Sequence, residues 1–257
     1  MDAAKQVRVA PVTVAGDLDI GDLRAALAAG WADYRAQPGF GLFLSAIFVA
    51  AGILVSVTAI AGGAAIWLVP VAAGFPLLAP FAAVGLYEVS RRRESGLPMT
   101  WAAILRALGG RGDEQILSMG VIVFVAFGFW IIVVHGIFAI FLDRPGIDPL
   151  AQLLSGPGIM MLLVGSAVGG VMAFAFYAIT VISLPMLVDR DVDFVTAIIV
   201  SLGTVRSNTA VMLAWAAIIA TALFIAMLPL FLGLLVVLPV LGHATWHLYR
   251  RVVGEAE

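Results

Sequence analysis

The stretch "GFGLFLSAIFVAAGILVSVTAI" (residues 39–60) contains no charged side chain and is long enough to cross a lipid bilayer. It lies inside a longer run, from Gln37 to Tyr87, that has no Asp, Glu, Lys or Arg. A membrane-spanning helix needs about 20 apolar residues, so this run accommodates two of them. The sequence therefore predicts a pair of transmembrane helices near 40–60 and 65–89, with a turn at "AIAGGAA" (59–65).

Three further charge-free runs predict the rest of the membrane domain. Pro229 divides the last run, because proline removes a backbone donor and disfavours continuation of a helix. The predicted spans in these runs lie near 117–141, 158–187, 208–227 and 230–249. Charged residues make up 12% of the chain, against roughly 25% in a soluble domain. The predicted fold class is an all-α polytopic membrane protein, a single domain with six transmembrane helices.

Basic residues predict the orientation. Of the 14 Lys and Arg residues, Arg144 alone falls in a loop on one side, and all the others fall on the opposite side. The positive-inside rule then predicts that both termini are cytoplasmic, in the inner membrane of a bacterium. A basic membrane face attracts anionic lipids. Membrane lipids are therefore the expected partners, and nucleic acid is not expected.

Short amphipathic segments precede the first, third and fifth spans, at 20–34, 99–108 and 194–205. Asp19 and Asp193 stand where N-caps of the first and third segments would be. Each segment is predicted to be a helix lying in the cytoplasmic interface. The same pattern, an interfacial helix followed by a transmembrane hairpin, thus recurs in three units, which gives a pseudo-threefold repeat. The predicted units are 18–90, 97–188 and 192–251, after a flexible tail at 1–17.

The end of the last predicted span reads "LGHATWHLYRR" (241–251), with His243 and His247 one helical turn apart. Two histidines at this spacing can hold a metal or haem, anchor a helix end at the headgroups, or bind lipid phosphate or Glu88. The chain has only three histidines and no cysteine. The pair lies on one face of one helix, and His135 is predicted to lie nearer the opposite interface. We therefore expect no haem, metal or other cofactor, and the anchor role is favoured.

The segment "YEVSRRRE" (87–94) lies where the second predicted span leaves the membrane. It is either a basic flank or a contact site, and Glu88 can pair locally with the arginines. The residues predicted to contact lipid or a partner are Glu88, Arg91, Arg92, Arg93, His243, Trp246, His247, Tyr249 and Arg250. Gly165 and Gly169, in "GSAVGG" (165–170), have the spacing that permits close helix packing.

The segments "GLYEVSRRRESGLPMTWAAILRAL" (85–108) and "LPVLGHATWHLYRR" (238–251) resemble the signature segments of the DUF2189 family. This resemblance implies a bacterial integral membrane protein without an established activity. Some family members carry the label cytochrome c oxidase subunit I. The oxidase catalytic subunit needs more histidine ligands than the three present here.

The favoured function is structural or accessory rather than enzymatic: a module that binds lipids or a membrane protein complex, alone or as a homo-oligomer. Two alternatives stay open. The second span contains residues that would kink or interrupt it, as in the broken helices of small-solute transporters: Pro70, Gly74, Pro76 and Pro80. The histidines would instead suit an accessory subunit of a respiratory oxidase.

Overall fold

The computed structural model describes residues 14–64, 67–108, 115–142 and 149–254, and these residues contain helices and no strands. The helices are α1 (Ile20–Ala36), α2 (Pro38–Ala61), α3 (Leu68–Glu94), α4 (Trp101–Leu108), α5 (Gln115–Leu142), α6 (Pro149–Leu153), α7 (Gly156–Thr180), α8 (Ser183–Asp189), α9 (Phe194–Ser207), α10 (Thr209–Met227) and α11 (Leu234–Val253). Helices therefore cover most of each predicted span and each predicted interfacial segment in the described residues, with turns at 181–182 and 228–233.

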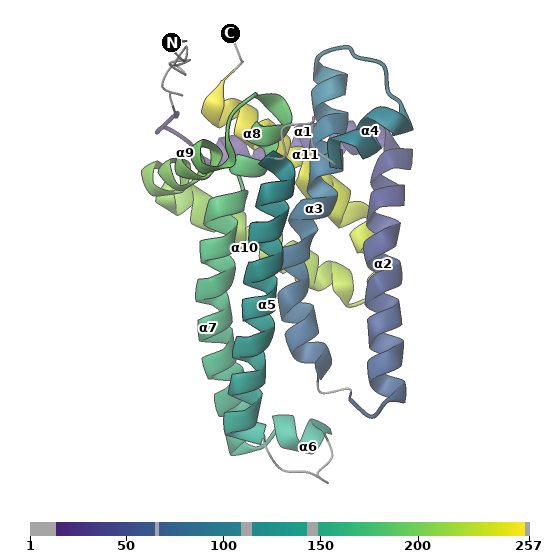
Figure 1. The fold of residues 1–257 in the computed structure, drawn as a ribbon, viewed down its shortest axis with the longest axis vertical. Helices are drawn as coiled ribbons and strands as arrows, with labels where there is room; N and C mark the ends of the chain where they lie inside the picture. The colour runs from purple at the N-terminus through teal and green to yellow at the C-terminus, as the bar shows by residue number, and fades with distance from the viewer. Residues whose placement is uncertain (1–13, 65–66, 109–114, 143–148, 255–257) are drawn as a thin grey trace, which may run out of the picture.

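Four helical segments among the described residues are long and apolar enough to cross a membrane. They are Pro38–Ala61, Gln115–Phe141, Gly156–Asp189 and Thr209–Met227. The helix α3 has 27 residues, a length of about 40 Å at 1.5 Å per residue, and it runs beside α2 and α5 (Figure 1). Residues 68–94 are helical without a break, so the prolines of the second predicted span do not interrupt it.

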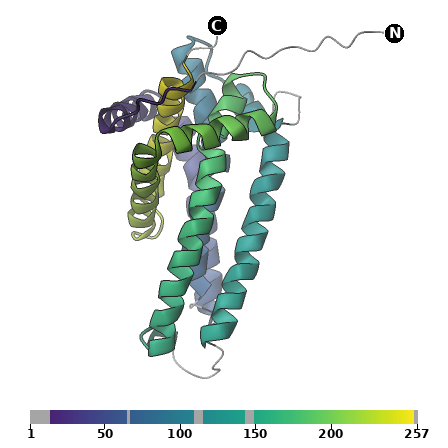
Figure 2. The ribbon, with the colours of Figure 1, turned by 90° about the vertical axis from the view of Figure 1, so that its left-hand side faces the viewer.

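One end of the molecule carries the short helices α1, α4, α8 and α9 together with the ends of α3 and α11 (Figures 1 and 2). Asp19 caps α1 by accepting a hydrogen bond from the Asp22 N–H, and Asp193 caps α9 through the Thr196 N–H. Both caps agree with the sequence. Every arginine that the structure describes lies on these elements or directly beside them. This end of the molecule is called the basic end below. The C-terminal ends of α2 and α5 and the N-terminal end of α7 lie at the opposite end (Figure 1).

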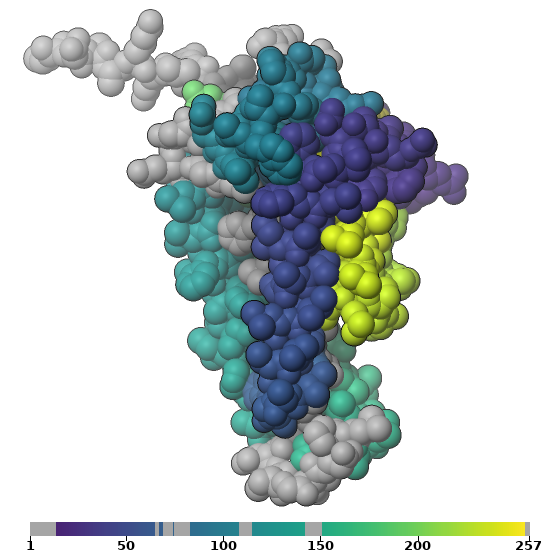
Figure 3. All heavy atoms as spheres, turned by 90° about the vertical axis from the view of Figure 1, so that its right-hand side faces the viewer, coloured from purple at the N-terminus to yellow at the C-terminus, as the bar shows by residue number. Residues whose placement is uncertain are grey.

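The α10–α11 hairpin reaches only part of the way along the long helices (Figures 1 and 2). A side chain on Gly52 of α2 would collide with the Phe231 ring in the turn between α10 and α11. Because α2 continues for nine residues beyond Gly52, it extends about 13 Å past this contact. Figure 3 shows the hairpin beside α2, stopping above the lower end of α2. The sequence predicted two full spans here. Thr209–Met227 of α10 is one of the four candidate spans and α11 is not among them, and the turn between them packs against the middle of α2.

The turn of this hairpin is tight and apolar. Leu230 and Phe231 have positive φ angles, 52° and 65°. Their N–H groups donate to the carbonyls of Leu228 and Met227, respectively. Leu228 and Leu230 are 67% and 72% exposed. The N–H groups of Leu230 and Phe231 are thus hydrogen-bonded within the turn, while the leucine side chains are exposed. Both features suit a turn that lies in lipid.

Glycines allow two close helix crossings. A Cβ on Gly30 of α1 would lie 2.6 Å from the Ala244 nitrogen and the Val240 oxygen of α11, so the two backbones touch. On α7, a Cβ at Gly169 would lie 2.9 Å from the Trp130 ring of α5, whereas one at Gly165 would lie 4.0 Å from Ile137. Of the two glycines predicted for helix packing, the structure thus places Gly169 in the tighter contact.

Candidate functional site

The predicted site residues gather at the basic end, around a carboxylate that α1 contributes. Asp33 is 1% exposed. Its Oδ2 accepts hydrogen bonds from Ser90 Oγ on α3, at 2.6 Å, and from His247 Nε2 on α11, at 2.8 Å. Its Oδ1 forms an ion pair with Arg93. One buried carboxylate therefore joins three helices that are far apart in the chain.

His243 extends this cluster into the core. Its side chain is fully buried, and its Nδ1 lies 2.8 Å from Ser90 Oγ. A hydroxyl has a single proton, and Ser90 donates it to Asp33, so the serine oxygen accepts from Nδ1–H. The Nε2 atom is enclosed and has no hydrogen-bond partner among the residues that the structure describes. The four side chains form one line of polar contacts: His243, Ser90, Asp33 and His247.

Burial and hydrogen bonding have opposite effects on the pKa of Asp33. Burial alone would raise it. The hydrogen bonds from His247 and Ser90 outweigh this effect and lower the pKa of Asp33 from 3.8 to about 2. Asp33 is therefore an ionised carboxylate held by donors from α3 and α11.

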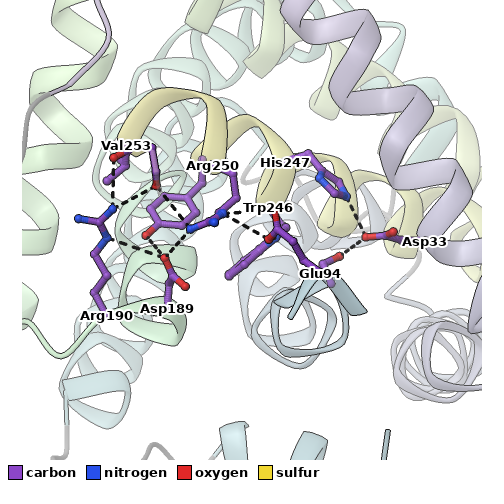
Figure 4. A network of polar contacts seen from close by, with 11 residues as sticks. Asp33, Glu94, Asp189, Arg190, Trp246, His247, Arg250 and Val253 are labelled. Carbon is purple, nitrogen blue, oxygen red and sulfur yellow. Dashed lines mark hydrogen bonds and ion pairs between the residues drawn. The ribbon is translucent and has the colours of Figure 1, made fainter. Parts of the chain in front are cut away.

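A second polar network joins α3, α8 and α11 nearby (Figure 4). Glu94 Oε2 accepts from Trp246 Nε1 at 3.1 Å and pairs with Arg250 at 3.2 Å. Asp189 Oδ2 accepts from Tyr249 Oη at 2.7 Å and from Arg250 at 3.3 Å. Arg250 thus bridges the ends of α3 and α8.

Glu88 is 3% exposed and pairs with Arg91 at 2.8 Å and Arg92 at 2.7 Å. This pairing is the local one that the sequence predicts. The sequence predicted that residues of the last helix contact lipid or a partner, but the structure buries three of them. His243, Trp246 and Tyr249 are 0% exposed, because α11 packs against α1, α2 and α3 and turns these side chains into the protein rather than toward headgroups.

Sequence reasoning missed Asp33 and Ser90. Asp33 follows Leu23, Ala26 and Gly30 on one face of α1, and all four are buried. A carboxylate in register with the apolar face of an amphipathic helix is the signal that would have revealed it. Ser90 carries no such signal, because it gains its role only through the crossing of α3 with α1 and α11.

His135 lies apart from this cluster, on α5, with its ring 4.4 Å from that of Trp67. Its Nδ1 contacts the Ile131 carbonyl at 2.8 Å. Among the described residues, no group of three or more His, Asp or Glu side chains is placed to hold a metal ion.

A cavity of about 410 Å³ lies between α3, α7, α10 and α11. Small-molecule sites are typically 300–1,000 Å³ and mostly apolar, so its size and character suit a ligand. Along α7 the lining runs from Gly170 to Thr180, a length of about 15 Å. The lining residues are Ala83, Tyr87, Gly170, Ala173, Phe174, Phe176, Tyr177, Thr180, Val181, Leu213, Ala216, Ala217, Ile219, Ala220, Leu223, Leu238, Leu241, Gly242 and Thr245.

These features define an integral membrane protein built from apolar helices, with a polar cluster at its basic end. Residues 68–189, from α3 to α8, match the DUF2189 family model, described as "Predicted integral membrane protein". The match confirms the family resemblance of the first signature segment; the second, at 238–251, lies outside it. No significant match is found among curated proteins or solved structures.

Proposed function

We propose that this protein is an accessory, non-enzymatic component of the bacterial inner membrane that binds a lipid-like molecule in the cavity between α7 and the α10–α11 hairpin. The single observation that carries the proposal is the cavity itself. Two of its walls, α7 and α10, are candidate membrane spans. Its lining consists mainly of aliphatic, aromatic and small side chains, which favour an alkyl chain over a polar solute.

The arrangement in the membrane is part of this proposal. Six helices enter the bilayer, in three units that each begin with an interfacial helix, and both termini face the cytoplasm. The gathering of the described arginines at one end supports this orientation. The third unit inserts as a shorter, oblique hairpin, and this leaves an opening beside α7 where the cavity lies.

The cluster around Asp33 supports a structural role for the basic end. It ties α11 to α1 through His247 and Asp33, and to α3 through His243 and Ser90, and so fixes one wall of the cavity. Leu241, Gly242 and Thr245 of that wall immediately flank His243 or lie within two residues of it. The polar cluster therefore stabilises the shape of the cavity in which the ligand binds.

The proposal can be tested by native mass spectrometry of the protein extracted from its own membranes in mild detergent. We expect one lipid-like molecule to remain bound per chain. Ala217→Trp should displace it by filling the cavity. Val171→Trp is the matched control, because Val171 also lies on a membrane helix but is 71% exposed and outside the lining. Loss of ligand in both variants, or retention in both, would contradict the proposal.

A further inference from the structure

The cavity contains four hydroxyl-bearing side chains, and three of them already donate to backbone carbonyls. Tyr177 donates to Met212 at 2.9 Å. Thr180 donates to Phe176 at 2.8 Å, and Thr245 donates to Leu241 at 2.8 Å. These three hydroxyl groups already donate hydrogen bonds within the protein, so they need no acceptor from a ligand.

Tyr87 is the exception. It lines the cavity and is 4% exposed. Its hydroxyl has no hydrogen bond among the described residues. The hydroxyl oxygen is also not among the fully enclosed polar atoms, so a molecule in the cavity can reach it. A phenol stays protonated at neutral pH because its ordinary pKa is near 10, so Tyr87 presents a donor. A donor that borders an apolar cavity without an acceptor is unfavourable, and a ligand oxygen would supply the acceptor.

The charge of the lining restricts that ligand. The described residues that line the cavity include no Asp, Glu, Lys, Arg or His. A phosphate, carboxylate or ammonium group placed there would lose its hydration without gaining a counter-charge. The part of the ligand inside the cavity is therefore uncharged.

The position of Tyr87 sets the direction of the ligand. Tyr87 lies three residues before Ser90, which belongs to the polar cluster at the basic end. The far part of the cavity runs along α7 to Gly170. A molecule that meets both features has its acceptor at the basic end and an apolar chain directed toward the centre of the membrane.

We infer that the cavity binds an uncharged amphiphile with a carbonyl oxygen, which accepts a hydrogen bond from Tyr87 while the apolar chain lies along α7. This inference rests on the proposed function and adds the chemical class of the ligand. Two sources supply this chemistry: the ester carbonyl of a neutral glycerolipid and the ring carbonyl of an isoprenoid quinone.

The test uses two photoreactive probes of equal chain length, a diazirine-bearing dodecanoic acid methyl ester and the corresponding hydrocarbon. Each is added to the purified full-length protein in detergent, and cross-linking to α7 and α10 is quantified. We expect the ester to label about five- to tenfold more strongly, the effect of one neutral hydrogen bond. Tyr87→Phe should abolish this preference, and Tyr177→Phe should retain it, because the Tyr177 hydroxyl is already bonded within the protein.

Thermal unfolding provides a second readout that does not depend on the probes. Tyr87→Phe should leave the melting temperature unchanged or raise it, whereas Tyr177→Phe should lower it. Two outcomes would overturn the inference if both probes still label the cavity. One is an ester preference that persists in Tyr87→Phe, and the other is the absence of any preference in the unaltered protein. Absence of labelling by either probe would overturn the proposed function as well.

Competition separates the two sources of the carbonyl. Dioctanoylglycerol and a decyl-substituted benzoquinone are added in turn against the ester probe. Stronger competition by one of them, lost in Tyr87→Phe, supports the inference and identifies the source. Competition that is equally strong in the unaltered protein and in Tyr87→Phe would contradict a role for the hydroxyl.

Discussion

Asp33 Oδ2 and His247 Nε2 lie 2.8 Å apart, although the two residues are separated by 214 positions in the chain. The contact joins the first described helix to the last. It also explains why one carboxylate can be buried at this end of a membrane protein: Ser90 and Arg93 satisfy its remaining capacity.

Asp33→Ala should therefore lower the free energy of unfolding by about 3 kcal/mol, the cost of leaving partners of a buried charge unsatisfied. Thermal unfolding in detergent micelles measures this. Asp17→Ala is the matched control, because Asp17 also pairs with an arginine, Arg251, but is 75% exposed. It should cause little change. Equal losses in the two variants would show that burial of Asp33 does not determine its contribution.

Acidification should destabilise the protein below about pH 4. The pKa of Asp33 is lower in the folded protein, about 2, than its ordinary value of 3.8. The unfolded chain therefore binds a proton in this interval that the folded protein does not, and stability present above the unfolded pKa is lost as the pH falls toward the folded pKa. The loss is about 2 kcal/mol over the interval.

Melting temperatures recorded between about pH 5 and about pH 2 test this prediction. In Asp33→Asn the slope over this interval should become shallower, because the side chain no longer titrates. A slope that is unchanged in this variant would mean that other groups cause the acid sensitivity.

Gly30→Ala should lower the free energy of unfolding by about 1–3 kcal/mol. The added Cβ would lie 2.6 Å from backbone atoms of α11, which cannot rotate away as a side chain could. The comparison is Gly39→Ala, in α2, where a Cβ meets nothing within 4 Å. That variant should be neutral or slightly stabilised, since alanine favours a helix over glycine. Equal effects would argue against the close α1–α11 crossing.

Membrane orientation can be measured with single cysteines, because the natural sequence contains none. Leu154→Cys, between α6 and α7, and Ser95→Cys, at the end of α3, are both exposed. A membrane-impermeant maleimide should label Leu154→Cys in intact cells whose outer membrane is permeable, and Ser95→Cys only after the inner membrane is opened. Labelling of both from the same side would contradict the proposed orientation.

The helix α9 should lie in the membrane interface through Val195, Ile199 and Leu202. These side chains are 49%, 63% and 43% exposed and follow one another at helical spacing. A spin label at Ile199→Cys should be protected from aqueous relaxation agents in bilayers, and a label at the exposed Arg206→Cys should not. Equal aqueous accessibility at both positions would place α9 outside the interface.

The sequence by itself determined the helical membrane class, because charge-free runs of sufficient length have few alternatives in water or lipid. Asp19 and Asp193 likewise marked two helix starts, since capping depends on neighbours only three residues away. Tertiary structure decided the rest. The α10–α11 hairpin stops short because Phe231 packs on Gly52, and Trp246 and Tyr249 are buried because α11 crosses α1 at Gly30. The cavity at Tyr87 exists only between four helices drawn from distant parts of the chain. Such contacts depend on how helices of similar apolar composition pack together, and that composition alone does not specify the partner.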